Sequence, residues 1–454
     1  MTHLHKYSCK PIRRALTRLM DGVAQHGYPV IGEYLQYRRA LLTEHRDEIQ
    51  ERIRPFAAEL GIYPFRLTSV ADVARLVHFT LHGSRTGYAR GGTPAIATSA
   101  LIWHGSKHHV AREILAFRTA DQALRTHDVI QQRTGPDGRY RVAFDPLGAN
   151  TGQFVADPTL VELARADCFL MRRAFVPTTG HTLVRAKYPQ LGDRVLAALT
   201  GDLALTKEIA TGGDIPGLLA RQLFRPAGSA SPSPAEVDVD RRRAQVIHSA
   251  LTAGRDAKSL AAELAVAVPD VENLIAGHGR LFFGVRDFLA DLRIRVCRDG
   301  YVDDCFRNRL DLPDAQLAGP VRPLRMTAAE RRLVSWRAAV DREFVSRREA
   351  AIQAAVEFVI RGPVAAIMLH GMAAAHDWLT VGGRRSVSLV LPIGDELHFF
   401  VPHDLVEQFA NHVPHLLTAD GAGRWGLPVP VAVTVSVGPS WGELAPWIGG
   451  NDRE

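Results

Sequence analysis

The chain reads Ser386-Val-Ser-Leu-Val-Leu-Pro-Ile-Gly-Asp395-Glu396-Leu-His-Phe-Phe-Val-Pro402 near its C-terminal end. Two apolar, strand-like runs flank the acidic dipeptide Asp395-Glu396. Carboxylates inside a sequence that otherwise resembles buried sheet are costly to desolvate unless a cation lies against them. The acidic pair therefore marks a candidate functional site.

The composition indicates a soluble protein with an excess of arginine. Its 454 residues are 46% hydrophobic and 23% charged, which is enough for several cores in one large multilobed unit or about two to three subdomains. The net charge is +7, and only six of the 55 basic residues are lysine. Guanidinium groups suit bidentate phosphate contacts, so a polyanionic partner is favoured. A general compositional bias toward arginine is the alternative explanation.

The cysteines and the N-terminal sequence indicate the cellular compartment of the protein. The four cysteines show no CxxC pair and no regular spacing, which argues against a zinc module and a disulfide framework, so we expect reduced thiols. They are Cys9, Cys168, Cys297 and Cys305. The first 14 residues contain no apolar segment, and no run of 18 apolar residues occurs in the sequence. We expect a cytoplasmic protein that does not associate with membranes.

Local patterns predict helices at the start of the chain and strands later. Residues 11–80 show helical periodicity with many charges and predict a long antiparallel helical pair. A second helical stretch covers 109–132, and strands are expected at 139–144 and 182–186. The segment 225–235 is rich in Pro and Ser and is expected to be a loop.

Several short motifs occur in an order that resembles family A DNA polymerases, the polymerase I type, over about residues 11 to 440. Each is weak alone, but the ordered series is specific. The motifs include Arg172-Arg-Ala-Phe-Val-Pro177, Gly212-Gly-Asp-Ile215, Arg241-Arg-Arg-Ala244, Gly300-Tyr-Val302, and Asp395-Glu396-Leu with Val401-Pro402.

The resemblance implies an α+β right-hand fold with a helical thumb, an antiparallel palm sheet and helical fingers, and without an exonuclease domain. The expected boundaries are 1–134 for the thumb and thumb-to-palm helices, 135–200 and 326–454 for the two parts of the palm, and 201–325 for the fingers.

The resemblance departs from the family at the catalytic carboxylates. Nucleotidyl transfer in the family needs two metal ions held by carboxylates on adjacent palm strands. One position aligns with Asp395, beside Glu396, but the other aligns with Lys187. An ammonium about 4 Å from a divalent ion opposes it by roughly 8 kcal/mol at an effective dielectric constant of 20.

We therefore expect no metal site, and Lys187 paired with Asp395 and Glu396. Two alternatives remain open. Lys187 turns to solvent or to a DNA phosphate, or Asp193 replaces the missing ligand.

The nucleotide-binding positions implied by the resemblance are also changed. Where the family has Lys, Phe and Tyr on the fingers helix, this chain has Gln245, Ser249 and Ala253, whereas Arg241 is retained and could hold a phosphate. Further family residues are replaced by Gln153 and Gly192, and by Gln353, Glu357 and Arg361 on one helix face.

By position, the residues expected to contact DNA are Arg85, Arg90, Arg118, Thr126, Arg139, Arg141, Gln190 and Arg309. These patterns predict a catalytically inactive, DNA-binding homologue that acts as an accessory in DNA replication or repair, with DNA and replication proteins as partners and no cofactor. One alternative is an active DNA-directed DNA polymerase that uses Mg²⁺ at a rearranged site. The other is a protein-interaction scaffold with a vestigial DNA cleft.

Overall fold

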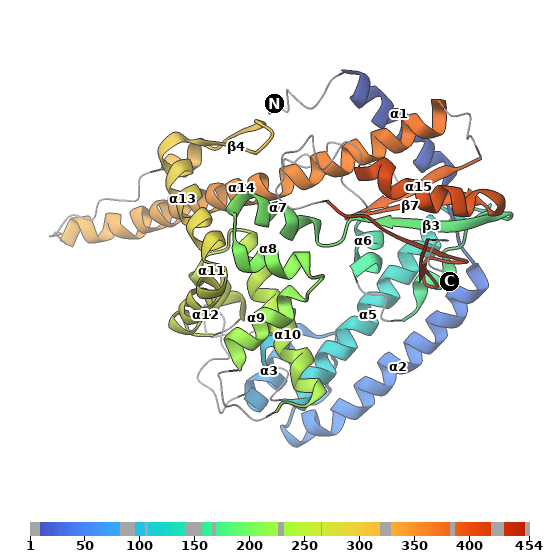
Figure 1. Ribbon diagram of the computed structural model, residues 1–454. Helices are drawn as coiled ribbons and strands as arrows, with labels where there is room; N and C mark the ends of the chain where they lie inside the picture. The colour runs from blue at the N-terminus through green and yellow to red at the C-terminus, as the bar shows by residue number, and fades with distance from the viewer. Residues whose placement is uncertain are drawn as a thin grey trace.

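A five-stranded antiparallel sheet joins distant parts of the chain in the computed structural model (Figure 1). Its strand order is β6 (Ser388–Ile393), β7 (Glu396–Pro402), β3 (His181–Lys187), β8 (Thr434–Gly438) and β9 (Ala445–Pro446). The structure describes residues 10–81, 96–104, 108–141, 157–165, 169–225, 231–264, 266–317, 328–381, 386–418 and 431–449. Strand β3 is therefore central although its neighbours follow it by some two hundred residues.

The two faces of this sheet have different environments. Val184, Ala186, Leu397 and Phe399 are buried on one face, in a core shared with α1 (Lys10–His26), α14 (Ala328–Val381) and α15 (Val406–Thr418). Because side chains alternate along a strand, the residues between them occupy the opposite face. That face is apolar at the Leu183 end, and its other end carries the charged residues of the candidate site.

The first lobe is formed by α2 (Gly32–Glu59), α3 (Val70–Leu81), α4 (Thr98–His104) and α5 (His109–Arg133). The ion pairs Arg39–Asp128 and Arg52–Glu113, at 3.1 and 2.9 Å, show that α2 and α5 run antiparallel. The helix predicted at 109–132 is confirmed. The pair predicted within 11–80 is wrong, because α2 packs on α5 and α1 packs on α14 and β6. Periodicity identifies an apolar face but not the element that covers it.

The second lobe contains α8 (Leu203–Ala210), α9 (Ile215–Phe224), α10 (Pro234–Thr252), α11 (Ala257–Leu264), α12 (Val268–Leu281) and α13 (Phe283–Asp299). Helix α7 (Leu191–Thr200) follows β3 directly and leads into this lobe, and the hairpin of β4 (Tyr301–Asp303) and β5 (Arg309–Asp311) follows α13. In Figure 1 the first and second lobes lie on the same side of the sheet.

Two predicted boundaries change. Of the loop predicted at 225–235, residues 226–230 lie outside the described residues, and Ser233 forms a reciprocal capping box with Glu236, so α10 begins at Pro234. The described part of the strand predicted at 139–144 contains β2 (Arg139–Tyr140), which pairs with β1 (Tyr28–Pro29), and 142–144 lie outside the described residues. The remaining short elements are α6 (Pro158–Arg165), η1 (Met171–Ala174), η2 (Pro313–Gln316) and η3 (His403–Leu405).

One stretch of α14 has the length and apolar composition of a membrane span. In the part of the chain that the structure describes, only Glu343–Thr380 passes this test, and 67% of its most apolar window is buried inside the protein. That burial is typical of a core helix. Cys297 and Cys305 are free thiols, whereas Cys9 and Cys168 lie outside the described residues.

Candidate functional site

Lys187 and Glu396 face each other across the central strands. They are direct partners in the antiparallel register of β3 and β7, and Lys187 Nζ donates a hydrogen bond of 2.9 Å to Glu396 Oε1. The Lys187 side chain is 36% exposed, whereas Glu396 is 9% exposed. The ammonium therefore lies against a nearly buried carboxylate at the end of the sheet, and the alternative in which Lys187 turns away does not hold.

Glu396 has two further partners on the same face. Arg185 Nη1 lies 3.6 Å from Glu396 Oε1, and His398 Nε2 lies 3.3 Å from Glu396 Oε2. Although burial raises the pKa of Glu396, the hydrogen bond from His398 and the neighbouring cations together lower it to about 2. Burial lowers the pKa of His398, so its neutral ring donates from Nε2. Glu396 is thus ionised and surrounded by donors.

Asp395 occupies the turn between β6 and β7. Its carbonyl accepts a hydrogen bond of 2.9 Å from the Tyr188 amide, and its carboxylate lies 3.6 Å from Lys187 Nζ. Burial raises the pKa of Asp395, Lys187 opposes this rise, and the charge of Glu396 adds to it. The acidic pair predicted from sequence is therefore brought together with Lys187.

The donor set does not fit a Mg²⁺ ion. Magnesium binds carboxylate and water oxygens in octahedral geometry, and here Lys187 and Arg185 both lie within 3.6 Å of the same Glu396 oxygen. Among the residues that the structure describes, no group of three or more His, Cys, Asp or Glu side chains is arranged to hold a metal. The charges that a metal would neutralise are neutralised by the side chains of β3.

Asp193, the alternative ligand, has a different partner. It lies in the first turn of α7, and its Oδ1 is 3.0 Å from His248 Nε2 on α10. His248 Nδ1 is in turn 3.1 Å from His278 Nε2 on α12. These contacts join α7 to the second lobe, and Asp193 is one member of them.

The predicted nucleotide-binding residues lie on one helix and bind each other or nearby groups. Gln245 Nε2 donates to Ser249 Oγ at 2.9 Å, and Arg241 Nε donates to Asp214 Oδ2 at 2.7 Å. Ala253 is the C-cap of the same helix, α10. Arg241 is about half exposed, so it is accessible but already paired.

The predicted DNA contacts also have partners within the protein. Arg139 donates to the carbonyls of His26 and Gly27, and Arg141 pairs with Asp137. Gln190 donates to the Gly213 carbonyl at 3.1 Å.

Two further arginines are similarly engaged. Arg118 donates to the Ile96 carbonyl, and Arg309 pairs with Asp303 and lies 3.8 Å from the centroid of the Tyr301 ring. Thr126 is buried, and Arg85, Arg90 and Gln153 lie outside the described residues.

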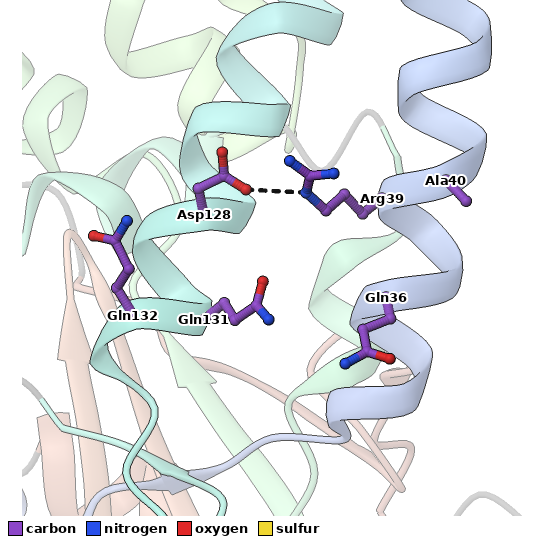
Figure 2. Close-up of a pocket in the computed structure, with 6 residues that line it drawn as sticks. All are labelled: Gln36, Arg39, Ala40, Asp128, Gln131 and Gln132. Carbon is purple, nitrogen blue, oxygen red and sulfur yellow. Dashed lines mark hydrogen bonds and ion pairs between the residues drawn. The ribbon is translucent and has the colours of Figure 1, made fainter.

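A groove of about 710 Å³ runs between α2 and α5 of the first lobe (Figure 2). The ion pair Arg39–Asp128 bridges it, and Figure 2 shows the Gln131 side chain reaching from α5 toward α2. The groove presents amide groups as well as charges. It is lined by Gln36, Arg39, Ala40, Asp128, Gln131 and Gln132.

Sequence reasoning missed Arg185 and His398. Both follow from alternation, because Arg185 is two residues before Lys187 and His398 is two residues after Glu396. Residues two apart on a strand share a face, so this pattern places Arg185 on the face of Lys187 and His398 on the face of Glu396. The pairing of Arg185 with His398 and Ser436 needs the register, which the sequence does not give.

Comparison with known proteins identifies the family. The model of DNA polymerase family A matches residues 32–443, so the chain belongs to this family. It is 27% identical over 415 residues to the thermostable DNA polymerase I of Thermus aquaticus, covering 89% of this chain and 45% of that protein. It is 27% identical over 366 residues to DNA polymerase I of Chloroflexus aurantiacus, covering 79% and 35%. The chain spans less than half the length of these curated relatives.

A solved structure supports the fold. The POL domain of Pol1 from M. smegmatis, in complex with DNA primer-template and dNTP, matches with a TM-score of 0.73 and 23% identity, covering 95% of this chain and 70% of that chain. The fold is therefore the right-hand polymerase fold, with helical thumb, palm sheet and helical fingers.

Proposed function

We propose that this chain is a DNA-binding member of family A whose palm no longer supports metal-dependent nucleotidyl transfer, and that it acts as an accessory in DNA replication or repair. The observation that carries the proposal is the contact of Lys187 Nζ with Glu396 and Asp395, at 2.9 and 3.6 Å. The proposal rests on the replacement of a metal-binding carboxylate of the family by the amine of Lys187 at the aligned position.

The residues at the predicted nucleotide-binding positions support the same proposal. The aligned family lysine is Gln245, whose amide binds Ser249, and the retained Arg241 is paired with Asp214. Loss of one electrostatic contact to a transition state typically costs about a hundred- to a thousandfold in rate. A site without its metal ligand and without its triphosphate lysine has little capacity for templated synthesis.

DNA binding is proposed from charge, fold and family. The net charge of +7 and the arginine excess favour a phosphate backbone, and the solved relative is in complex with DNA primer-template. We expect micromolar or tighter binding to primer-template DNA, weakening about tenfold or more between 50 and 200 mM salt. Fluorescence anisotropy over a salt series measures this. An affinity that is unchanged by salt, or no binding, contradicts the proposal and favours a protein-interaction scaffold.

Primer extension tests the catalytic part. The protein is incubated with primer-template, dNTPs and either Mg²⁺ or Mn²⁺, beside Asp395→Ala and an active family A polymerase. We expect no extension by the protein. Extension that is abolished by a chelator and by Asp395→Ala overturns the proposal and identifies an active polymerase with a rearranged site.

A further inference from the structure

The second lobe contains a small cavity with largely apolar walls. The cavity has a volume of about 260 Å³ and lies where α10, α12 and α13 pack against α14. Each of these helices contributes an apolar side chain to the wall: Leu251, Ile275, Leu289 and Val356. Sites for drug-sized ligands have volumes of about 300–1,000 Å³, so this cavity fits a smaller molecule.

A buried histidine forms part of the cavity wall. His278 is only 2% exposed, and it lines the cavity from α12. Its Nε2 lies 3.1 Å from His248 Nδ1, and His248 Nε2 lies 3.0 Å from Asp193 Oδ1. One ring nitrogen of His278 is therefore engaged inside the lobe, and Nδ1 is the ring nitrogen that remains for a ligand.

The carboxylate of Asp193 determines which ring nitrogens carry a proton. An ionised carboxylate only accepts hydrogen bonds, so His248 donates to Asp193 from Nε2. Burial lowers the pKa of His278 to about 3, so its ring is neutral. With His248 also neutral, its Nδ1 accepts and His278 donates to it from Nε2. His278 Nδ1 therefore carries no proton, and a ligand meets it with an O–H or N–H donor.

Arginines supply the charged part of the wall. The lining includes Arg255, Arg286 and Arg293 beside the acidic Asp256. Each arginine is paired with a carboxylate that does not itself line the cavity, as Arg286 is with Asp287 at 2.8 Å. Because a guanidinium has five N–H donors, an ion pair with one carboxylate does not use all of them. The ion pairs orient the guanidinium groups and leave donors for an anionic ligand.

Arg286 lies beside the buried histidine. A Cβ atom at Gly279, the residue after His278, would lie 2.9 Å from Arg286 Cδ. Glycine at this position therefore lets the Arg286 side chain pass directly over α12. A cation and a hydrogen-bond acceptor are in this way placed next to each other in a largely apolar cavity.

We propose that this cavity binds a small organic acid that has an apolar body and an O–H or N–H donor. The donor binds His278 Nδ1, the acid group binds Arg286, and the apolar body packs against the helices. The predicted nucleotide-binding residues Gln245, Ser249 and Ala253 do not line the cavity, so the ligand site is separate from theirs. The proposal does not depend on DNA binding.

The test uses hydroxybenzoate as the probe. Isothermal titration calorimetry at pH 8 measures the binding of 3- and 4-hydroxybenzoate to the wild-type chain, and at least one isomer is expected to bind with a Kd of about 1 mM or tighter. The matching fluorobenzoate has a similar shape without the donor, and the matching hydroxybenzyl alcohol lacks the acid. Each is expected to bind about tenfold or more weakly, because a buried polar group is then left unpaired.

Three variants locate the ligand. Arg286→Leu should weaken hydroxybenzoate binding about tenfold or more. Arg280→Leu makes the same charge change at an exposed arginine of α12 that does not line the cavity, and it should keep the wild-type affinity. Asp193→Asn leaves the cavity wall intact, but an amide can donate or accept, so it no longer fixes the proton of His248. The preference for hydroxybenzoate over fluorobenzoate should then fall to about twofold or less.

Absence of binding of both hydroxybenzoates to the wild-type chain overturns the proposal. Equal affinities for hydroxybenzoate and fluorobenzoate also overturn it, because His278 then accepts no hydrogen bond from the ligand. Binding that Arg286→Leu leaves unchanged, or a preference that Asp193→Asn leaves unchanged, places the ligand elsewhere and overturns it as well. None of these outcomes bears on the proposed function, which the salt series and primer extension test separately.

Discussion

Lys187 of β3 lies directly opposite Glu396 of β7, with its Nζ 2.9 Å from Glu396 Oε1. The register of the sheet therefore determines which charged groups meet at the site. Because the two residues are cross-strand partners, the backbone register places the amine beside the carboxylate. A cation that belongs to the fold thus takes the position where the family resemblance places a metal ligand.

Removing the amine should destabilise the protein. In Lys187→Met, Glu396 keeps Arg185 and His398 but loses its shortest hydrogen bond, and Asp395 loses its nearby cation. Since Lys187 is partly exposed, we expect a loss of about 1–2 kcal/mol in the free energy of unfolding at pH 7. Urea denaturation measures it.

Lys207→Met, an exposed lysine on α8, is the matched control and should change stability little. In a double-mutant cycle, Lys187→Met with Glu396→Gln should destabilise less than the sum of the single changes. Strict additivity would show that the two side chains do not interact.

Restoring a carboxylate should create a weak metal site. In Lys187→Asp, the new carboxylate would lie beside Asp395 and Glu396, so the site gains a ligand and loses a cation. Arg185 remains near Glu396, so we expect only millimolar affinity and a gain of about 1 kcal/mol in stability at several millimolar Mg²⁺.

A thermal unfolding series with and without Mg²⁺ measures this gain. Lys187→Gln removes the charge without adding a ligand, and it should show no Mg²⁺ response. If the wild-type chain is stabilised by Mg²⁺ as much as Lys187→Asp, the built-in amine does not exclude the ion.

Acid should destabilise the second lobe through His278. Burial, with a smaller effect of neighbouring His248, lowers the pKa of His278 to about 3. Between that value and about 6.5 the unfolded chain binds a proton that the folded chain does not, so the free energy of unfolding falls as pH falls below 6.5. The slope from this group reaches about 1.4 kcal/mol per pH unit.

His278→Asn removes the titrating group and should flatten the pH dependence, whatever it does to stability at pH 7. Urea denaturation at several pH values between 7 and 4 gives the slopes. His403→Asn, at an exposed histidine on η3, is the control substitution. A His278→Asn profile parallel to that of the wild-type chain would contradict the assignment.

The sequence predicts those parts of the site that depend on local pattern. The two apolar runs within Ser386–Pro402 predict two strands with the acidic pair set between them, and the structure has β6 and β7 there with Asp395 between them. The strand predicted at 182–186 is likewise confirmed as β3. These features need only neighbouring residues, because an apolar run of strand length is a local property of the sequence.

Contacts between segments that are distant in the sequence could not be predicted from local pattern. The family resemblance placed Lys187 near Asp395, but the second cation on Glu396, Arg185, depends on the register of β3 with β7. The contact of Asp193 with His248 spans two helices, and nothing in either helix alone indicates it. Packing partners, such as α5 for α2, are set by the whole core rather than by one amphipathic face.

The start of α10 at Pro234 can be tested by substituting its N-cap residue, Ser233. Ser233 Oγ accepts from the Glu236 amide, and Glu236 accepts from the Ser233 amide at 2.8 Å. Ser233→Ala should cost about 1 kcal/mol in the free energy of unfolding. Ser231→Ala, at an exposed serine just before the cap, should cost much less. Equal effects would place the helix start elsewhere.

The pairing of Arg241 with Asp214 should limit DNA affinity. Asp214→Asn keeps a hydrogen-bond acceptor but removes the charge that neutralises Arg241, whose side chain is about half exposed. If Arg241 contacts a phosphate, affinity for primer-template DNA should rise about two- to fivefold at low salt and less at high salt, because exposed charges are screened. Asp238→Asn makes the same charge change beside Arg242 on α10 and controls for net charge. Equal gains in the two variants would show a general charge effect and remove Arg241 from the DNA-binding surface.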